Sequence, residues 1–569
     1  MSDVPFIETT RKRVMRRKAA LWADRASWFD HWREISEYQQ PRLGRFFESD
    51  SNDGRKRHQH IIDSTALFAA RTLSSGLMSG MTSPARPWFR LGLQDRELAK
   101  SGPVRSWLFQ TTTLLRAVFN KSNTYHALHS LYDELGLFGT GATIVLPNFE
   151  NVIHHHALTI GEYALGINEL GAVDTLVRET RMTVGQLVKQ FGKANCSSAV
   201  VRIYDRGNYD ERVPVVHLIQ PRRDRDARKL DNRNMPFESV YIETGGNDDK
   251  PLSESGFKRF RALTPRWSVT GNDTYGAGPG MEALGDVKQL QHQQHRKSQA
   301  IDYKVNPPLQ VPTSLKSAAF NRLPGGVTYV DSVGNSQAVR SAFDVDLDLS
   351  HLLADIQDVR ERIRSAFYAD LFLMLANETR SNVTATEVAE RHEEKLLMLG
   401  PVLERLQNEL LSPLIDLAFD ECRDAGILPP IPEELAEQEI EVEFISTLAQ
   451  AQRVVSAQST DRFLGSVTSL MTVKPDVIDK VNFDKAIDDY AELYGTNPDI
   501  VNSADVVAEL RAQRERAAAA AQAAAAAPVA ADTAKTASEI DSAGLRDVMG
   551  MFSGYGSPTS TEVETLPAA

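Results

Sequence analysis

Cysteine is almost absent from this chain of 569 residues, which holds only Cys196 and Cys422. Two cysteines so far apart supply neither a disulfide framework nor a zinc site, so we expect a reducing compartment and inert thiols. Long hydrophobic runs are missing too, since nowhere do 18 apolar residues follow one another, which argues against a membrane span. The basic N-terminus also lacks the apolar core and the cleavage site of a secretion signal.

Positive charge is in deficit. The chain has 64 Lys and Arg residues against 76 Asp and Glu residues, a formal net charge of −12. Proteins that coat nucleic acid normally present an excess of Lys and Arg to the phosphates. Any contact with DNA is therefore expected to be local or weak.

The motifs of nucleotide hydrolysis and of nucleophilic catalysis are missing. The nearest approach to the phosphate loop G-x-x-x-x-G-K-[ST] has Leu187 in place of the first glycine and Ala194 in place of the final Ser or Thr. The stretch GLMSG at residues 76–80 has its serine one position too late for the nucleophile elbow G-x-S-x-G. We predict a protein that is not an enzyme and that uses no cofactor.

Metal-ligand patterns are weak. His154–His156 are adjacent in a predicted strand, so only alternate side chains share a face, and exposed or turn histidines are the preferred interpretation. Asp344, Asp346 and Asp348 imitate half of a calcium loop, but Leu349 stands where its turn requires glycine. Carboxylates at the start of a helix explain them better. We predict no metal site.

The first 280 residues combine helices with a mostly antiparallel β region, so the predicted fold class is α+β. The patterns predict helices over 5–40, 61–78 and 103–138, with Gly80 ending the second. Strands are predicted from residue 139 through 179 and again at 197–207, 212–220 and 238–244, around a short helix at 183–191.

The pattern changes near residue 280. Residues 281–305 predict a long helix with few large apolar side chains, which needs flanking neighbours to be stable. A small proline-bracketed α/β insert follows, and then a second long helix. Thr384 and Glu387 form a T-x-x-E capping box that starts a leucine-seamed helix, which Pro401 and Pro413 should bend. A strand and further helices to residue 516 complete the organised part.

Four cationic or titratable residues lie together on the first long helix. They are His292, His295, Arg296 and Lys297. Two interpretations stay open, because these side chains either face a DNA channel or face solvent or a neighbouring helix.

The stretch SSGLMSGMTSPARPWFRL, residues 74–91, is better explained by architecture than by chemistry. Small residues such as Gly76 and Gly80 let the end of a helix pack closely against its neighbours. Pro84 and Pro87 favour an extended exit segment after the helix. Trp88 and Phe89 are expected to anchor this segment in a core.

Three stretches in the same order resemble one known family. They are the L-x-S-G-x-x-x-P-x-x-x-W-F-x-L type signature at 77–91, FGTGATIVLP at 138–147 with GAVDTLVRE at 171–179, and TATEVAERHEEKLLMLGPVLERLQNELLSPLI at 384–415. Together they resemble the portal, or head-to-tail connecting, proteins of short-tailed double-stranded DNA bacteriophages. The resemblance covers roughly residues 15 to 515.

The resemblance implies a ring-forming portal fold, a homododecamer whose subunits share one set of parts. The implied parts are a wing at 1–280, stem helices at 281–304 and 346–376 around a clip at 305–345, a tunnel loop at 377–386, a kinked wing helix with a joining strand at 387–446, a crown at 447–527 and a mobile tail at 528–569. In the tunnel loop, Asn377, Arg380 and Asn382 are the expected DNA contacts.

The implied function is a conduit at one capsid vertex of the virion, through which DNA is packaged and ejected and to which the tail attaches. The implied partners are the terminase large subunit, tail adaptor or tube proteins, scaffold and major capsid protein, with assembly in the host cytoplasm. Two alternatives stay open: a tail adaptor or tube ring, and a metal-dependent nucleic-acid hydrolase that uses the carboxylates between Asp344 and Asp355.

Overall fold

The chain divides into two units, residues 1–482 and 483–569. The computed structural model describes residues 9–47, 54, 60–95, 98, 101–229, 231–245, 250–305, 309–310, 340–341, 350–377, 399–435, 438–445, 464–467, 469, 481–487 and 506–521. Most of the predicted clip, the aspartates at 344–348, the tunnel loop beyond residue 377, the capping box at Thr384 and Glu387, and the tail at 528–569 lie outside these residues.

Among the described residues, five helices dominate the N-terminal region, together with one short strand. They are α1 (Thr10–Asp24), α2 (Ala26–Tyr38), α3 (Thr65–Met81), α5 (Gly102–Lys121) and α6 (Thr124–Phe138), with β1 (Phe89–Leu93) between α3 and α5. The single helices expected over 5–40 and 103–138 are thus each divided, and α3 runs past Gly80. Gly80 is therefore not the stop that the sequence predicted.

The two unexpected breaks have partners distant in sequence. Buried Arg25, between α1 and α2, donates hydrogen bonds to the carbonyls of Gly161 and Tyr163. Asn123, between α5 and α6, exchanges two hydrogen bonds of 2.8 Å with the backbone of His155. Each side chain satisfies polar backbone groups of the β region, which a continuous helix would leave out of reach.

The β region is antiparallel, as predicted. One sheet has the order β4-β5-β6-β7-β8, made of Tyr163–Ile167, Val173–Thr183, Arg212–Pro221, Phe237–Glu243 and Ser253–Phe257. A second has the order β3-β2-β9, made of Val152–Leu158, Ala142–Asn148 and Ala262–Leu263. Every strand pair within the two sheets is antiparallel.

One predicted strand is wrong. Residues 197–207 were expected to form a strand, but the structure has helix α8 (Ser198–Asp205) there. Ser197 caps this helix by accepting from the Val200 amide, and its hydroxyl donates to Glu243 at 2.7 Å. The cap and one buried apolar residue, Val200, outweigh the strand propensity. The preceding helix α7 (Val184–Phe191), with a capping box between Thr183 and Gln186, was predicted correctly.

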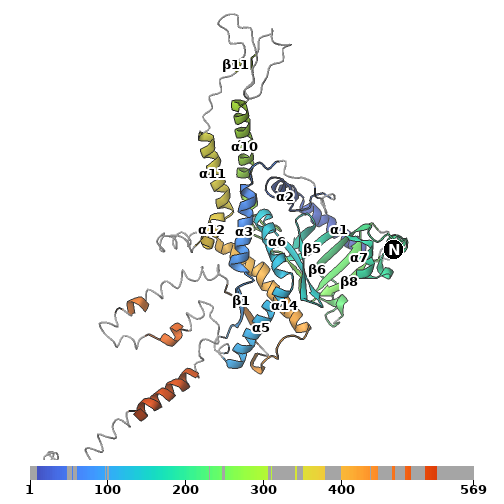
Figure 1. Ribbon diagram of the computed structural model, residues 1–569. Coiled ribbons are helices and arrows are strands. Elements are labelled where there is room, and N and C mark those ends of the chain that lie inside the picture. The colour runs from blue at the N-terminus through green and yellow to red at the C-terminus, as the bar shows by residue number, and fades with distance from the viewer. Residues whose placement is uncertain are drawn as a thin grey trace, which may run out of the picture. The chain divides into compact units, whose positions relative to one another are not determined.

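Two long helices form a hairpin beside this body (Figure 1). They are α10 (Leu284–Val305), entered through the short α9 (Pro279–Glu282), and α11 (Ser350–Ala366), followed by α12 (Ala369–Asn377). Between them the described strands β10 (Leu309–Gln310) and β11 (Arg340–Ser341) pair antiparallel. The second long helix is not continuous as expected, because Tyr368 adopts a left-handed φ of 53° between α11 and α12.

The leucine-seamed helix is distorted at one of its two prolines. Residues 399–406 are α-helical, residues Gln407–Leu411 form a π-helical turn, and α14 (Ser412–Asp424) follows. Pro413 cannot donate to the carbonyl four residues earlier, at Glu409, and the wider turn accommodates this loss. The bend predicted at Pro401 stays a prediction, because the turn before residue 399 lies outside the described residues. The seam of Leu399, Leu403, Leu406 and Leu410 is buried.

Strand β12 (Ile440–Phe444) then returns and pairs antiparallel with β1. In the second unit, residues 483–487 and 506–521 are helical, and Arg511 pairs with Asp484 at 2.6 Å. Among the residues that the structure describes, no helix is long and apolar enough to cross a membrane.

Candidate functional site: the helical hairpin and its anchorage

Polar pairs set the register of the α10–α11 hairpin. Gln293 donates a hydrogen bond to Asp355, and Arg362 pairs with Asp286 at 3.2 Å. Positions 293 and 286 on α10 therefore lie level with 355 and 362 on α11, an antiparallel pairing of constant register. The seam between the helices is apolar and consists of Val287, Leu290, Ile356, Val359 and Ile363.

Amide side chains replace the large apolar residues that α10 lacks. Gln291 accepts from the amides of Ile62 and Asp63 at 2.7 and 2.8 Å and donates to the Asp63 carbonyl at 2.8 Å. Gln294 donates to the Asp63 carboxylate at 3.0 Å. These glutamines are buried, so much of the flanking support that α10 needs comes from α11, from α2 and from residues 62–63 of the same chain.

Asp63 joins three helices at the base of the hairpin. Its carboxylate caps α3 by accepting from the Thr65 amide at 2.9 Å, and Arg360 of α11 binds it at 2.7 Å. Burial by itself raises the pKa of Asp63, but the hydrogen bonds from Thr65 and Arg360 outweigh burial and lower the pKa below its ordinary value. Sequence reasoning missed Asp63, whose partners on α10 and α11 lie more than 200 residues away.

The four candidate channel residues on α10 do not share one face. His292, His295 and Arg296 are exposed, whereas Lys297 is half-buried and lies about 140° around the helix from His292 at 100° per residue. Arg296 contacts His292 at 3.5 Å and Gln299 at 3.4 Å. Among the described residues, none of the four candidates forms an ion pair with a carboxylate.

Of the tunnel-loop candidates, only Asn377 lies within a described element, as the last residue of α12. Arg380 and Asn382 lie outside the described residues. Their role as DNA contacts stays a prediction.

The signature at 74–91 lies in the protein core. A Cβ on Gly76 would be 2.2 Å from Cγ of Phe372, so α3 and α12 pack at a distance that only glycine permits. Trp88 and Phe89 are buried with their rings 4.5 Å apart, and Trp88 Nε1 donates to the Tyr125 hydroxyl at 3.2 Å. Pro84 lies in an exposed turn and not in the extended exit that we expected.

The same signature connects to a segment more than 300 residues later. Strand β1 pairs with β12, with Leu91 opposite Val442, and Arg90 binds Glu443 at 2.6 Å. The Ile445 amide donates to the Trp88 carbonyl at 3.0 Å. The end of α3 and the segment after the π-helical turn therefore belong to one structural unit.

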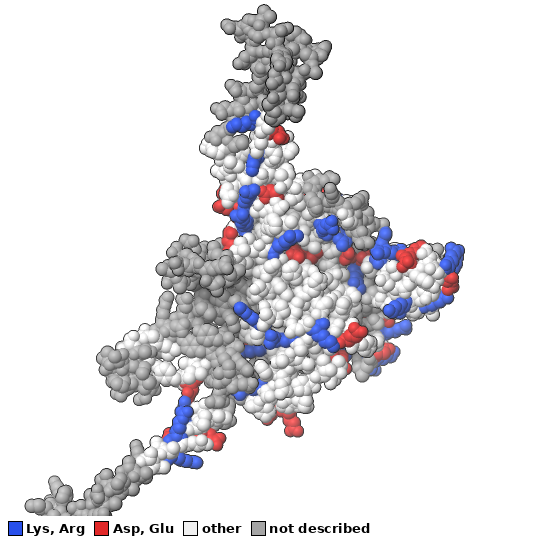
Figure 2. All heavy atoms as spheres, in the orientation of Figure 1, with Lys and Arg blue, Asp and Glu red and all other residues white. Residues whose placement is uncertain are grey.

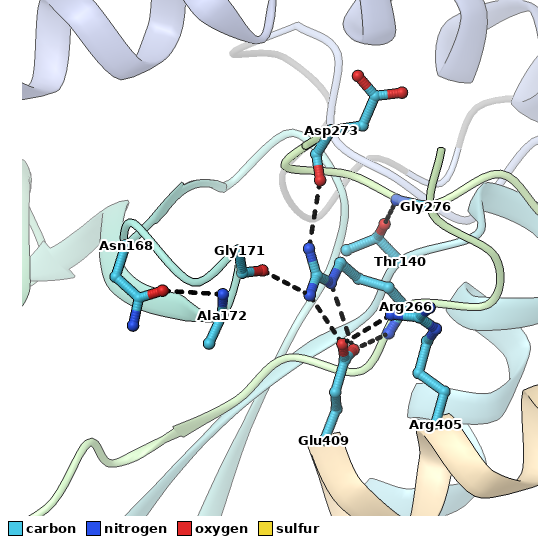
Figure 3. Close-up of polar contacts among 9 residues, drawn as sticks. All are labelled: Thr140, Asn168, Gly171, Ala172, Arg266, Asp273, Gly276, Arg405 and Glu409. Carbon is cyan, nitrogen blue, oxygen red and sulfur yellow. Dashed lines mark hydrogen bonds and ion pairs between the residues drawn. The ribbon is translucent and has the colours of Figure 1, made fainter. Parts of the chain in front are cut away.

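A buried arginine fastens the π-helical turn to the β region (Figure 3). Arg266 is 4% exposed and binds Glu409, inside the π turn, at 2.7 Å. Its guanidinium also donates to the carbonyls of Gly171 and Asp273 at 3.0 and 3.2 Å. Arg405, one turn before Glu409, binds the same carboxylate at 3.2 Å.

The three consecutive histidines do not form a metal site. His154 and His156 share one face of β3, with ring centroids 5.0 Å apart, and His155 is buried on the other face against Thr124 at 3.1 Å. Burial lowers the pKa of His155 to about 3, so this side chain is neutral. The expected exposure is therefore wrong for His155. Within the described part of the chain, no group of three potential ligands is close enough to hold a metal ion.

Taken together, the fold defines a mixed helix-and-sheet protein with a two-helix hairpin beside its body. Residues 11–501 match the sequence model of a family described as bacteriophage head to tail connecting protein, and the chain belongs to that family.

Two curated relatives match over nearly their whole length. The "Probable portal protein" of Bordetella phage BPP-1 is 53% identical over 551 residues, 96% of this chain and 99% of the relative. The "Portal protein" of Salmonella phage epsilon15 is 42% identical over 552 residues, 97% of this chain and 99% of the relative. A solved chain from the virion of a native gene transfer agent particle aligns with 70% of this chain and 95% of its own length, at 11% identity and a TM-score of 0.30.

Proposed function

We propose that twelve copies of this chain form a portal ring at one vertex of a phage capsid, the conduit for DNA packaging and ejection and the attachment point of the tail. The observation that carries the proposal is the family match over residues 11–501, supported by two near-full-length relatives named as portal proteins. The protein acts in the virion as a structural component and not as an enzyme, and a separate terminase hydrolyses ATP.

The described elements support an assignment of parts. The α10–α11 hairpin is the stem, and the segment between its helices, with the β10–β11 pair at its root, is the clip that receives terminase and later the tail adaptor. The N-terminal helices, the two sheets and the π-distorted helix form the wing. The residues after 447 form the crown, and scaffold and major capsid protein contact the wing and crown during assembly.

The charge of the chain suits a conduit. Twelve copies of a chain with net charge −12 carry −144 formal charges. Phosphates are repelled by such a ring, so DNA slides through it without being held, while isolated cations such as Arg380 prevent complete exclusion. A protein that stores DNA would need the opposite balance.

Electron microscopy of the purified chain tests the proposal. We expect rings with a central hole wide enough for duplex DNA in negative stain. A homogeneous monomer at every protein and salt concentration would contradict the ring. Incubation with labelled DNA and Mg²⁺ separates the conduit from a hydrolase, because DNA cleavage by the pure protein would contradict the non-enzymatic assignment.

A further inference from the structure

The outward face of α10 presents Arg296 beside two histidines, whereas the outward face of α11 presents carboxylates. On α10 the exposed His292, His295 and Arg296 fall within about 100° of arc. On α11 the outward stripe has the carboxylates of Asp358 and Glu361 and otherwise small or neutral residues. Figure 2 shows charges of both signs along the hairpin.

The three arginines of α11 lie on the flanks of its acidic stripe, and two of them have carboxylate partners in the same chain. Arg360 binds Asp63 and Arg362 binds Asp286. Arg362 also reaches Asp358 at 3.4 Å, but this pair is exposed, with Asp358 at 66%, and exposed pairs of this kind stabilise a protein only weakly. Asp358 and Glu361 therefore remain available to a stronger partner.

The hairpin register brings the opposite faces to similar heights. Because 293 is level with 355, His292 is level with position 356, about 3 Å along the axis from Asp358 at 1.5 Å per residue. Arg296 lies about 9 Å from Asp358 on the same scale. Helical side chains lean toward the N-terminus of their own helix, so Arg296 leans toward the base and Asp358 leans away from it, which closes this gap.

The charge distribution selects one way of assembling copies. A two-fold dimer would bring like faces together, basic on basic or acidic on acidic, which is repulsive. Head-to-tail contact places the α10 face of one copy on the α11 face of the next, which is attractive. Beside the α11 stripe, a groove exposes the apolar Ile62, Phe68 and Leu373 at 53%, 63% and 49%, as a surface covered by a partner would.

We propose that His292, His295 and Arg296 of one copy dock on Asp358 and Glu361 of a second copy, so that these α10 residues bind protein and not DNA. The inference rests on the proposed ring and assigns one of its subunit contacts. The hairpin thus contributes directly to the head-to-tail order of the assembly.

Charge reversal with rescue tests the contact. Arg296→Glu and Asp358→Arg should each raise the protein concentration needed for half-assembly by about tenfold or more, since each places like charges in the contact. The double variant should restore assembly. Lys304→Glu is the matched control, because it makes the same charge change at an exposed α10 position about 120° from His292 and should leave assembly unchanged.

Cross-linking locates the contact in the assembled ring. Treated with a short bismaleimide, the His292→Cys, Asp358→Cys double variant should give a ladder of linked subunits, and the wild-type chain, with Cys196 half-buried and Cys422 buried, should not. Rings that survive both single reversals, or a double variant that is not rescued, would overturn the inference and leave the ring proposal intact. Failure of the wild-type chain to form rings would instead overturn the proposed function.

Discussion

Trp88 lies in a stretch whose sequence resembles a reactive loop, but its side chain packs in the hydrophobic core. It contacts Phe89 and Phe119, donates to Tyr125 and, through its carbonyl, holds Ile445. These contacts connect β1 to α5, to α6 and to the end of β12. Loss of its side chain therefore affects several elements at once.

We predict that Trp88→Ala lowers the free energy of unfolding by about 3–5 kcal/mol, the usual cost of removing a large buried aromatic. Trp88→Phe keeps a ring and loses only the hydrogen bond to Tyr125 and some volume, so it should cost less. Thermal unfolding measures both. Phe109→Ala, at a position 42% exposed, is the control and should change stability little. Equal losses at 88 and 109 would refute the core role.

Glu134 predicts a pH dependence. It is buried, which raises its pKa to about 8 despite hydrogen bonds from Thr159 and the Ile160 amide, and the nearby Glu162 and Asp133 raise it further. The folded state therefore holds this proton more tightly than the unfolded state does. The contribution of Glu134 to stability should be greatest below its ordinary pKa of 4.5 and should be lost as the pH rises from about 4.5 to 8.

In Glu134→Gln, the fall in stability between these pH values should become shallower, although the variant starts lower because its amide nitrogen cannot accept from Ile160. Melting temperatures across this pH range test the prediction. Glu150→Gln, at an exposed carboxylate, should keep the wild-type slope. An unchanged slope in Glu134→Gln would show that this carboxyl is not responsible.

At the scale of elements, two close packings hold the hairpin and the π-distorted helix to the body. Helix α12 approaches α3 at Gly76, and the π turn is fastened to the β region by Arg266 and Glu409. Both depend on single residues whose partners lie far away in sequence.

Gly76→Ala should destabilise the protein by about 1–3 kcal/mol, because its Cβ would overlap the Phe372 ring. Gly285→Ala is the matched control: it is also a helical glycine, but its Cβ meets nothing within 4 Å, and alanine there should stabilise by up to about 1 kcal/mol. Chemical denaturation compares the two. A neutral Gly76→Ala would mean that α12 moves away without cost.

Glu409→Ala should cost about 3 kcal/mol or more, because it leaves the nearly buried Arg266 without its carboxylate. Asp416→Asn removes an exposed partner of Arg259, since the side chains of Arg259 and Asp416 are 55% and 48% exposed. This variant should cost less than about 1 kcal/mol. Unfolding curves of the two variants distinguish a buried clamp from a surface pair. Equal small losses would argue against the clamp.

At the scale of the whole molecule, the proposed conduit combines general repulsion of DNA with a few local contacts. The net charge of −12 belongs to the whole chain, whereas the proposed tunnel-loop contact depends on one cation, Arg380. Assembly and DNA passage are therefore expected to be separable.

Arg380→Glu should spare ring assembly but impair packaging or DNA retention, since it adds a negative charge where DNA passes. Ring formation is followed by electron microscopy and packaging by DNA protected from nuclease. Arg202→Glu, the same charge change on an exposed face of α8, should leave both unaffected. Wild-type packaging by Arg380→Glu would remove the tunnel-loop role.

Local patterns were enough to predict much of the fold. The alternating strands β5 to β7, the capped helix α7 and the two long helices around an insert were all predicted, because hydrophobic period and capping chemistry act within a few residues. The family resemblance also followed from the sequence. The site residues were harder: Gly76 and Trp88 were named, but Asp63 and Arg266 were not.

The sequence by itself therefore determined the fold class, the order of the elements and the family. Only the tertiary structure decided where long helices break, at Arg25, Asn123 and Tyr368, and that residues 198–205 are helical. It also decided that three glutamines of α10, at positions 291, 293 and 294, are buried and that the side chains at 292, 295 and 296 face outward. The physical reason is range: these outcomes depend on hydrogen bonds and packing between residues tens to hundreds of positions apart, which no local pattern encodes.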